Sequence, residues 1–429
     1  MTTAAGPGTP EATPTAPDPA LRARHARRIT GALFLSQSLG SAGSIAAATV
    51  AAIVGAELSG SVAWAGLPGA LTQVGVALGA LAWSRASDRI GRRGALSGAL
   101  LTGALGALLS LFGVASGNFA LVLVGLFVGG SGNSGVQLGR FVAAEVNPKA
   151  RRARALATVV LGGTFGSVVG PLLVGPTSAL VTTWGWNEIA GPYLATGVGY
   201  FLTAILLFTS LRPEPRLIGE AIAREERGPA AATAPARDLP QLLRDPSVRT
   251  AIASVVTAHM VMVGLMQMTS LHMHGLAHPL TSIAIVFSSH TFGMFAFSMV
   301  SGWLADRWGR RPVLGLGATI TLLSCLMAPL SPELLPLSVA LFLLGLGWNL
   351  CYVAGSALLS DALAPSEKGR MQGFNDLLVG GAAAAATLLG GWVMAGPGGY
   401  TTMGLLGAAA TAPLLLVVAR LPKGRPPAA

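Results

Sequence analysis

The chain has 429 residues, of which 52% are hydrophobic and only 10% are charged, and its mean hydropathy is +0.63. A soluble domain carries about 25% charged residues, so this composition excludes an ordinary soluble protein and indicates a membrane protein. The net charge of +11 does not indicate a nucleic-acid partner, because the basic residues gather in short segments between apolar stretches.

Apolar stretches of roughly twenty residues follow one another along the chain, and each is long enough to cross a hydrocarbon core ~30 Å thick. They predict an all-α membrane protein with two parallel six-helix halves, at 29–211 and 250–421. The twelve helices are expected at 29–56, 61–83, 94–115, 118–141, 155–176, 189–211, 250–273, 279–304, 312–330, 334–359, 373–395 and 400–420.

Three remaining segments are expected in the cytoplasm. Residues 1–28 predict a disordered tail without the apolar core of a signal peptide, 212–249 predict a linker, and 422–429 predict a second tail. With the exception of Arg140, every Lys and Arg falls on this side of the predicted membrane. The positive-inside rule therefore places both termini in the cytoplasm and the chain in the cell inner (plasma) membrane.

An internal repeat supports the two halves. The segment DRIGRR at 88–93 recurs 218 residues later as DRWGRR at 306–311, and the same offset carries Gly-Gly at 162–163 onto Gly-Gly at 380–381. A repeat of half the chain, with six apolar spans in each copy, is typical of transporters built from two parallel bundles.

The second copy and the residues before it, GWLADRWGRR at 302–311, resemble the signature loop of the major facilitator superfamily. In that superfamily the loop lies between helices two and three and again between helices eight and nine. The resemblance implies the major facilitator fold and a secondary transporter that works by alternating access.

These two loops are expected to gate the cytoplasmic side. Glycine permits a tight turn, Asp caps a neighbouring helix end, and Arg pairs with carboxylates at nearby helix ends. Anchoring of the loops to lipid headgroups is the simpler alternative. The expected gating residues are Asp88, Arg89, Gly91, Arg92, Glu145, Asp306, Arg307, Gly309, Arg310, Asp361 and Asp376.

Methionine and histidine are concentrated in the seventh and eighth predicted helices. Residues 26–258 contain neither, whereas 259–299 contain seven of the twelve Met and five of the six His. At ~1.5 Å per residue, the pairs Met262/Met266 and His290/Met294 lie level near the membrane midplane. Thioether and imidazole groups suit Cu(I) and suit Mg²⁺ or Ca²⁺ poorly. An accessory relay is expected from His259, Met268, His272, Met273 and His274.

The M-x-x-x-M and H-x-x-x-M motifs on consecutive helices resemble those of the CcoA-like copper importers, a branch of the superfamily. By this resemblance Met262, Met266, His290 and Met294 bind copper as imported cargo. No resident cofactor is expected, and the expected partners are the copper ion and the lipid bilayer, with the chain acting as a monomer.

Two other interpretations stay open. Met stripes also pack apolar gaps, and a soft Met-lined pocket suits a drug/proton antiporter that exports amphipathic organic compounds. The glycines before Pro171 in helix five favour that antiporter, whereas the lack of a midplane acidic residue in the first half weakens it. Arg140 is expected to pair with Glu145 or Asp376. No phosphate loop, nucleophile elbow or Cys-x-x-Cys is present, so the chain is not an enzyme.

Overall fold

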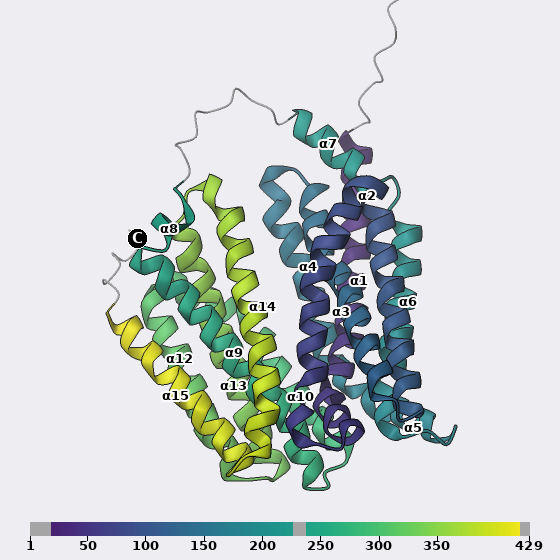
Figure 1. Ribbon diagram of the computed structural model, residues 1–429. Helices are drawn as coiled ribbons and strands as arrows, with labels where there is room; N and C mark the ends of the chain where they lie inside the picture. Colours follow the sequence, from purple (N-terminus) through teal and green to yellow (C-terminus); the bar gives the residue numbers. More distant parts are fainter. Residues whose placement is uncertain (1–18, 226–236, 421–429) are drawn as a thin grey trace, which may run out of the picture.

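The computed structural model describes residues 19–225 and 237–420, which form helices with no strand among them (Figure 1). The first half contains α1 (Pro19–Ser59), α2 (Leu67–Ala115), α3 (Phe119–Glu145), α4 (Lys149–Leu172), α5 (Val174–Thr182) and α6 (Gly191–Ser210). The second half contains α9 (Pro246–Gly275), α10 (Leu280–Phe295), α11 (Ser298–Trp308), α12 (Arg310–Met327), α13 (Leu334–Asp361), α14 (Pro365–Ala395) and α15 (Gly399–Ala419). Between the halves lie α7 (Pro215–Glu225) and α8 (Leu239–Leu242).

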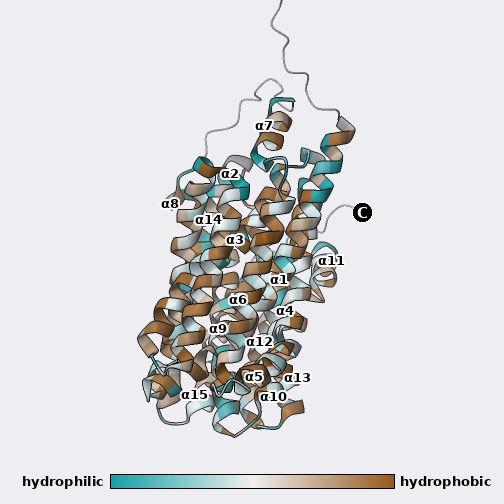
Figure 2. Cartoon of the chain, turned by 90° about the vertical axis from the view of Figure 1, so that its right-hand side faces the viewer, coloured by the Kyte–Doolittle hydropathy of each residue, from teal (hydrophilic) through white to brown (hydrophobic). Residues whose placement is uncertain are grey.

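Eleven helical stretches among the described residues are long and apolar enough to cross a membrane. One of them, Val62–Ala115, has 54 residues and contains the non-helical Gly91 (φ 79°, ψ 169°), so it accounts for two of the twelve predicted spans. Hydrophobic residues follow the bundle along its length, and hydrophilic residues gather around α7 (Figure 2). The predicted all-helical membrane architecture is confirmed for the described residues.

Three predicted helix boundaries differ from the structure. Helix α1 begins at Pro19, so residues 19–28 of the expected tail are helical, while 1–18 lie outside the described residues. The fifth helix divides into α4 and α5, because Pro171 and Pro176 lack the amide hydrogens that a continuous helix needs. The eighth divides into α10 and α11 at 296–297. The described parts of the expected linker include α7, α8 and the start of α9.

We call the end of the bundle that carries α7 and α8 the linker end (Figure 1). The halves contact each other mainly at the other end of the bundle, which we call the opposite end. There α2 packs on α14, and α4 packs on α10. At Gly66 the approach is so close that a Cβ atom would lie 1.7 Å from the Thr387 carbonyl oxygen. Among the described residues, the one cluster of buried apolar side chains that both halves share includes Ile53 and Phe287. Toward the linker end, α1, α3 and α6 form a separate core around Leu33 and Leu207.

Hydrogen bonds between the halves lie at the same end. Thr291 Oγ1 donates to the Ser167 carbonyl over 3.0 Å, and Ser288 Oγ donates to the Val168 carbonyl over 3.0 Å. His274 Nε2, near the end of α9, lies 2.7 Å from Glu57 Oε1, near the end of α1, also at the opposite end. The structure therefore shows the state in which the two halves are joined at the opposite end.

Candidate functional site

The four residues predicted to bind copper lie on α9 and on the last turns of α10. Met262 and Met266 are 3% and 7% exposed and belong to the apolar cluster shared by the halves, against which Met294 packs. His290 is fully buried, and its Nδ1 donates to the Leu341 carbonyl of α13 over 2.8 Å. No polar contact joins the four side chains among the described residues, so the copper site stays a prediction.

The residues of the expected relay have separate partners. His259 Nδ1 accepts a hydrogen bond from Trp348 Nε1 over 3.0 Å, and the His272 ring stacks on Tyr400 with centroids 4.3 Å apart. Met268 and Met273 are fully buried, and His274 contacts Glu57. Within residues 19–225 and 237–420, no group of three or more His, Cys, Asp or Glu side chains is arranged to hold a metal.

An aromatic cluster occupies α13 and its neighbours at the level of His259. The Trp348 and Tyr352 rings are stacked, with centroids 4.9 Å apart and planes 23° from parallel, and Phe295 meets Trp348 edge-on at 6.1 Å. Two charged groups act electrostatically on the Tyr352 hydroxyl: Arg140 of the first half and Asp376 of α14. The cluster is largely buried: Trp348 is 6% exposed, and Tyr352 and Phe295 are half-buried.

Arg140 is not hydrogen-bonded to either predicted partner. Its guanidinium lies 5.0 Å from the Phe141 ring centroid, and its Nε is buried without a hydrogen-bond partner. Glu145 is bound to Arg92 instead, and Asp376 accepts a hydrogen bond from Gln372. A charge in this position is costly in a membrane interior and is retained where it has a function.

Asn349 of α13 forms hydrogen bonds at the break in the eighth helix, and sequence analysis did not single out this residue. Its Nδ2 donates to the Met294 carbonyl over 2.6 Å and to Ser298 Oγ over 2.8 Å, and its Oδ1 accepts from Ser301 Oγ over 2.5 Å. The break leaves the Met294 carbonyl without its helical hydrogen bond, and Asn349, which is 2% exposed, supplies a donor where water is excluded.

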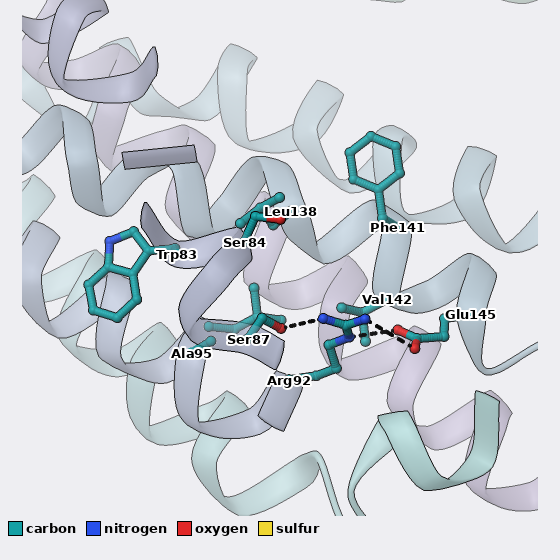
Figure 3. A pocket seen from close by; sticks show the side chains of 10 residues that line it. Trp83, Ser84, Ser87, Arg92, Ala95, Leu138, Phe141, Val142 and Glu145 are labelled. Carbon is teal, nitrogen blue, oxygen red and sulfur yellow. Dashed lines mark hydrogen bonds and ion pairs between the residues drawn. The ribbon is translucent and has the colours of Figure 1, made fainter. Parts of the chain in front are cut away.

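The first of the two repeated loops, at 88–93, forms a set of polar contacts at the linker end (Figure 3). Arg92 binds Glu145 through Nε at 2.9 Å and Nη2 at 3.3 Å, and it also donates to Ser87 and Asp88. Behind the ion pair lies a cavity of about 290 Å³, with Trp83, Leu138 and Phe141 in its walls.

The cap of this loop comes from the linker. Asp88 was expected to cap a helix end, but it pairs with Arg92 instead. The Glu214 carboxylate accepts hydrogen bonds from the Arg92 and Arg93 amides, where the helix restarts after Gly91. A Cβ on Gly91 would lie 2.9 Å from that carboxylate, so the absence of a side chain permits this close contact. Glycine also adopts the positive φ at this position without strain.

The second loop repeats the arrangement with fewer partners. Gly309 has φ 88°, Arg310 donates to Asp306 over 2.6 Å and to Asp361 over 3.2 Å, and Arg307 lies over the Trp303 ring. Arg89 is exposed. Among the described residues, the ion pairs of each loop stay within one half, so in this state they do not join the halves.

The linker also docks on the second half, through Arg237. Its Nε and Nη2 both lie 2.9 Å from the Glu367 carboxylate, which further accepts the amides of Ala364 and Arg237. Hydrogen bonding from Arg237 is the main cause that lowers the pKa of Glu367 from 4.5 to about 2. Glu367 lies just before the membrane span that begins at Arg370, and its side chain is nevertheless buried. The hydrogen bonds from Arg237 and Ala364 stabilise its charged carboxylate there.

Replacing Glu367 by Gln is expected to lower the thermal unfolding midpoint at neutral pH, because Gln cannot carry the charge that Arg237 binds. A folded-state pKa below the ordinary value gives stability that is present above pH 4.5 and is lost as the pH falls toward 2. The difference between wild type and Glu367→Gln should be constant from pH 7 to 5.5 and shrink below 4.5. A difference that does not change with pH would contradict the assignment.

Comparison with known proteins identifies the fold and its relatives. The family model of the Major Facilitator Superfamily matches residues 33–288 and 270–429. The uncharacterized MFS-type transporter YdeG of Bacillus subtilis is 32% identical over 399 residues, which cover 91% of each chain. Riboflavin transporter RfnT of Brucella anthropi is 29% identical over 400 residues, which cover 93% of this chain and 97% of that relative.

Solved structures agree in fold alone. A bacterial homologue of the human lysosomal transporter Spinster superposes with a TM-score of 0.64 at 16% identity, covering 92% of this chain and 95% of that chain. A POT family transporter in complex with 5-aminolevulinic acid gives 0.66 at 13% identity, covering 91% and 96%.

Proposed function

Because the chain belongs to the Major Facilitator Superfamily, it is a secondary transporter, and we propose that its substrate is an amphipathic organic molecule with a flat aromatic ring system. The observation that carries this proposal is the aromatic cluster of Trp348, Tyr352, Phe295 and His259, which joins α9, α10 and α13 of the second half. Aromatic faces of this kind bind flat rings by stacking, and each such contact contributes about 0.5–1.5 kcal/mol beyond burial.

The charges near the cluster support the same substrate class. Arg140 of α3 and Asp376 of α14 both act electrostatically on Tyr352, so groups of both signs are near the cluster for the polar part of an amphipathic molecule. The full-length relative RfnT is named a riboflavin transporter, and riboflavin combines a flat heteroaromatic ring with a polar chain. Riboflavin is therefore the first compound to test.

The linker end is assigned to the cytoplasm. Basic residues crowd that end in both halves, with Arg92 and Arg93 in the first loop and Arg310 and Arg311 in the second. In this assignment the structure is closed toward the outside, where Gly66 meets Thr387 and Thr291 meets Ser167. Alternating access then consists of breaking these contacts and bringing the cytoplasmic ends of the two halves together.

The test is riboflavin transport by the purified chain in proteoliposomes, measured by flavin fluorescence in both directions. Trp348→Ala should lower the rate at subsaturating riboflavin by about tenfold, because it removes the stacking face and the bond to His259. Trp392→Ala is the matched control, since Trp392 is 61% exposed on the outer surface and should leave transport unchanged. Equal rates in wild type and Trp348→Ala would reject the aromatic site.

Copper import is the second candidate, and one observation favours it. The bond from Nδ1 to the Leu341 carbonyl fixes the tautomer of His290, so the Nε2 lone pair is free to bind a soft ion, with Met294 one turn further along α10. The same proteoliposomes, loaded with a Cu(I) chelator, measure this function. Copper entry that falls in Met266→Ala and Met294→Ala but persists in Trp348→Ala would favour copper over the organic substrate.

A further inference from the structure

Arg140 of α3 is a cation whose hydrogen-bond donors are unused within the part of the chain that the structure describes. A guanidinium stays charged at any ordinary pH and presents its N–H donors in one planar fork. The Nε of Arg140 is buried without a hydrogen-bond partner. The Phe141 ring centroid lies 5.0 Å from the guanidinium carbon, and this contact gives the N–H groups no oxygen to bind.

Arg140 lies on the side of α3 that looks toward the second half. It acts electrostatically on the Tyr352 hydroxyl of α13, although α3 packs mainly on its own half and on α7, and α13 packs on the second half. Gln137, one turn earlier on the same face of α3, is exposed although it lies inside a membrane span. A carboxamide facing lipid would lose its hydrogen bonds, so this face of α3 meets water rather than lipid.

The two carboxylates expected to neutralise Arg140 have other partners. Glu145 accepts from Arg92 at 2.9 and 3.3 Å, and Asp376, which is exposed, accepts from Gln372 over 2.8 Å. Arg140 is therefore a charge within a membrane span that the described part of the protein does not pair in this state. Such a charge is costly and is a functional hypothesis by default.

We propose that Arg140 binds an oxyanion, a carboxylate or a phosphate group, on the transported molecule. This inference rests on the proposed function, because it takes the aromatic cluster as the site of the ring and identifies the polar part of the substrate as an anion. A guanidinium binds either group through two parallel N–H···O bonds, which also fix the orientation of the ligand. Arg140 would thus decide between anionic and neutral molecules that share one ring.

Asp376 gives the proposal a second consequence. Its carboxylate and the Arg140 guanidinium both act on Tyr352, so an anion bound at Arg140 is repelled by Asp376. Loss of Arg140 should weaken binding of the anion, and loss of Asp376 should strengthen it. If the two residues instead serve to pair with each other when the linker end closes, both losses should change binding in the same direction.

The test compares probes that share a ring and differ in one charged group. The purified chain in nanodiscs of neutral lipid is titrated with flavin mononucleotide and riboflavin, and with naphthoate and naphthamide, and binding is followed by probe fluorescence. The wild type should bind the anion of at least one pair about tenfold more tightly than its neutral partner. Preference in the flavin pair identifies phosphate, and preference in the naphthalene pair identifies carboxylate. A misfolded fraction cancels in this ratio, so a purely structural role of Arg140 would not change it.

Arg140→Gln should reduce the preference to less than about twofold. Arg140→Lys keeps the charge without the planar fork and should lower it at least about threefold, so a folding failure of one variant leaves the other to decide. Asp376→Asn should raise the affinity for the anion about twofold to threefold. Arg249→Gln is the matched control, because Arg249 is exposed at the start of α9 and its loss should leave the preference unchanged.

Four results would overturn the inference: no preference in either pair, a preference that persists in both Arg140 variants, one that Arg249→Gln removes equally, or one that Asp376→Asn lowers as Arg140→Gln does. Failure of the proposed function is distinguishable, because Trp348→Ala should weaken both members of a pair equally. Neutral probes that depend on Trp348 without any gain for the anion would reject this inference alone. An anion preference that depends on Arg140, with affinities that Trp348→Ala does not change, would reject the aromatic site alone. Binding of none of the four probes would reject both.

Discussion

Replacing Gly66 by alanine is expected to reduce transport at least about tenfold while both halves stay folded. The new Cβ would lie 1.7 Å from the Thr387 carbonyl oxygen, and a backbone atom of the other half cannot move aside as a side chain can. Gly66 itself has an ordinary φ of −82°, so alanine brings no strain within its own half. The variant therefore cannot adopt the state in which the opposite end is closed.

Transport in proteoliposomes measures this effect, together with the distance between spin labels on Thr183 and Leu335, exposed residues of the two halves at the opposite end. The label distance should stay long, and the thermal unfolding midpoint should change little. Gly31→Ala is the control, because a Cβ at Gly31 meets nothing within 4 Å. Wild-type transport by Gly66→Ala would show that the contact with Thr387 is not needed in the cycle.

Replacing Asn349 by Leu is expected to destabilise the second half by about 2–3 kcal/mol. The change keeps the volume but removes three hydrogen bonds, each worth about 0.6–1 kcal/mol in a membrane protein. The Met294 carbonyl, freed by the helix break, is then left in an apolar core. The measurement is the free energy of unfolding in detergent from a denaturant titration.

Thr319→Val is the matched control for Asn349→Leu. Thr319 is exposed and donates only to the Gly315 carbonyl of its own helix, so its loss should cost less than about 0.5 kcal/mol. Equal stability of Asn349→Leu and wild type would mean that the break in the eighth helix does not depend on Asn349. The segment would then be held by packing around Phe297 and Phe342 alone.

Local sequence predicted the parts of the two repeated loops that depend on neighbouring residues, while their role as gates stays a prediction. Gly91 and Gly309 take the positive φ that the tight turn requires, and Arg92 and Arg310 pair with carboxylates of their own half. The cap from Glu214 was missed, because a linker residue meets an amide 122 positions away only after the chain has folded. The resemblance to CcoA-like importers rests on two short motifs and stays a prediction.

The sequence by itself determined the all-helical membrane fold and its two related halves. Hydropathy and the repeated loop are properties of short segments, and a membrane allows such segments only a helical solution. The tertiary structure decided the site. It joined His259 to Trp348, gave His290 a single partner on α13, and brought Thr291 to the carbonyl freed by Pro171. Such contacts depend on how helices distant in sequence rotate and pack, which periodicity does not specify.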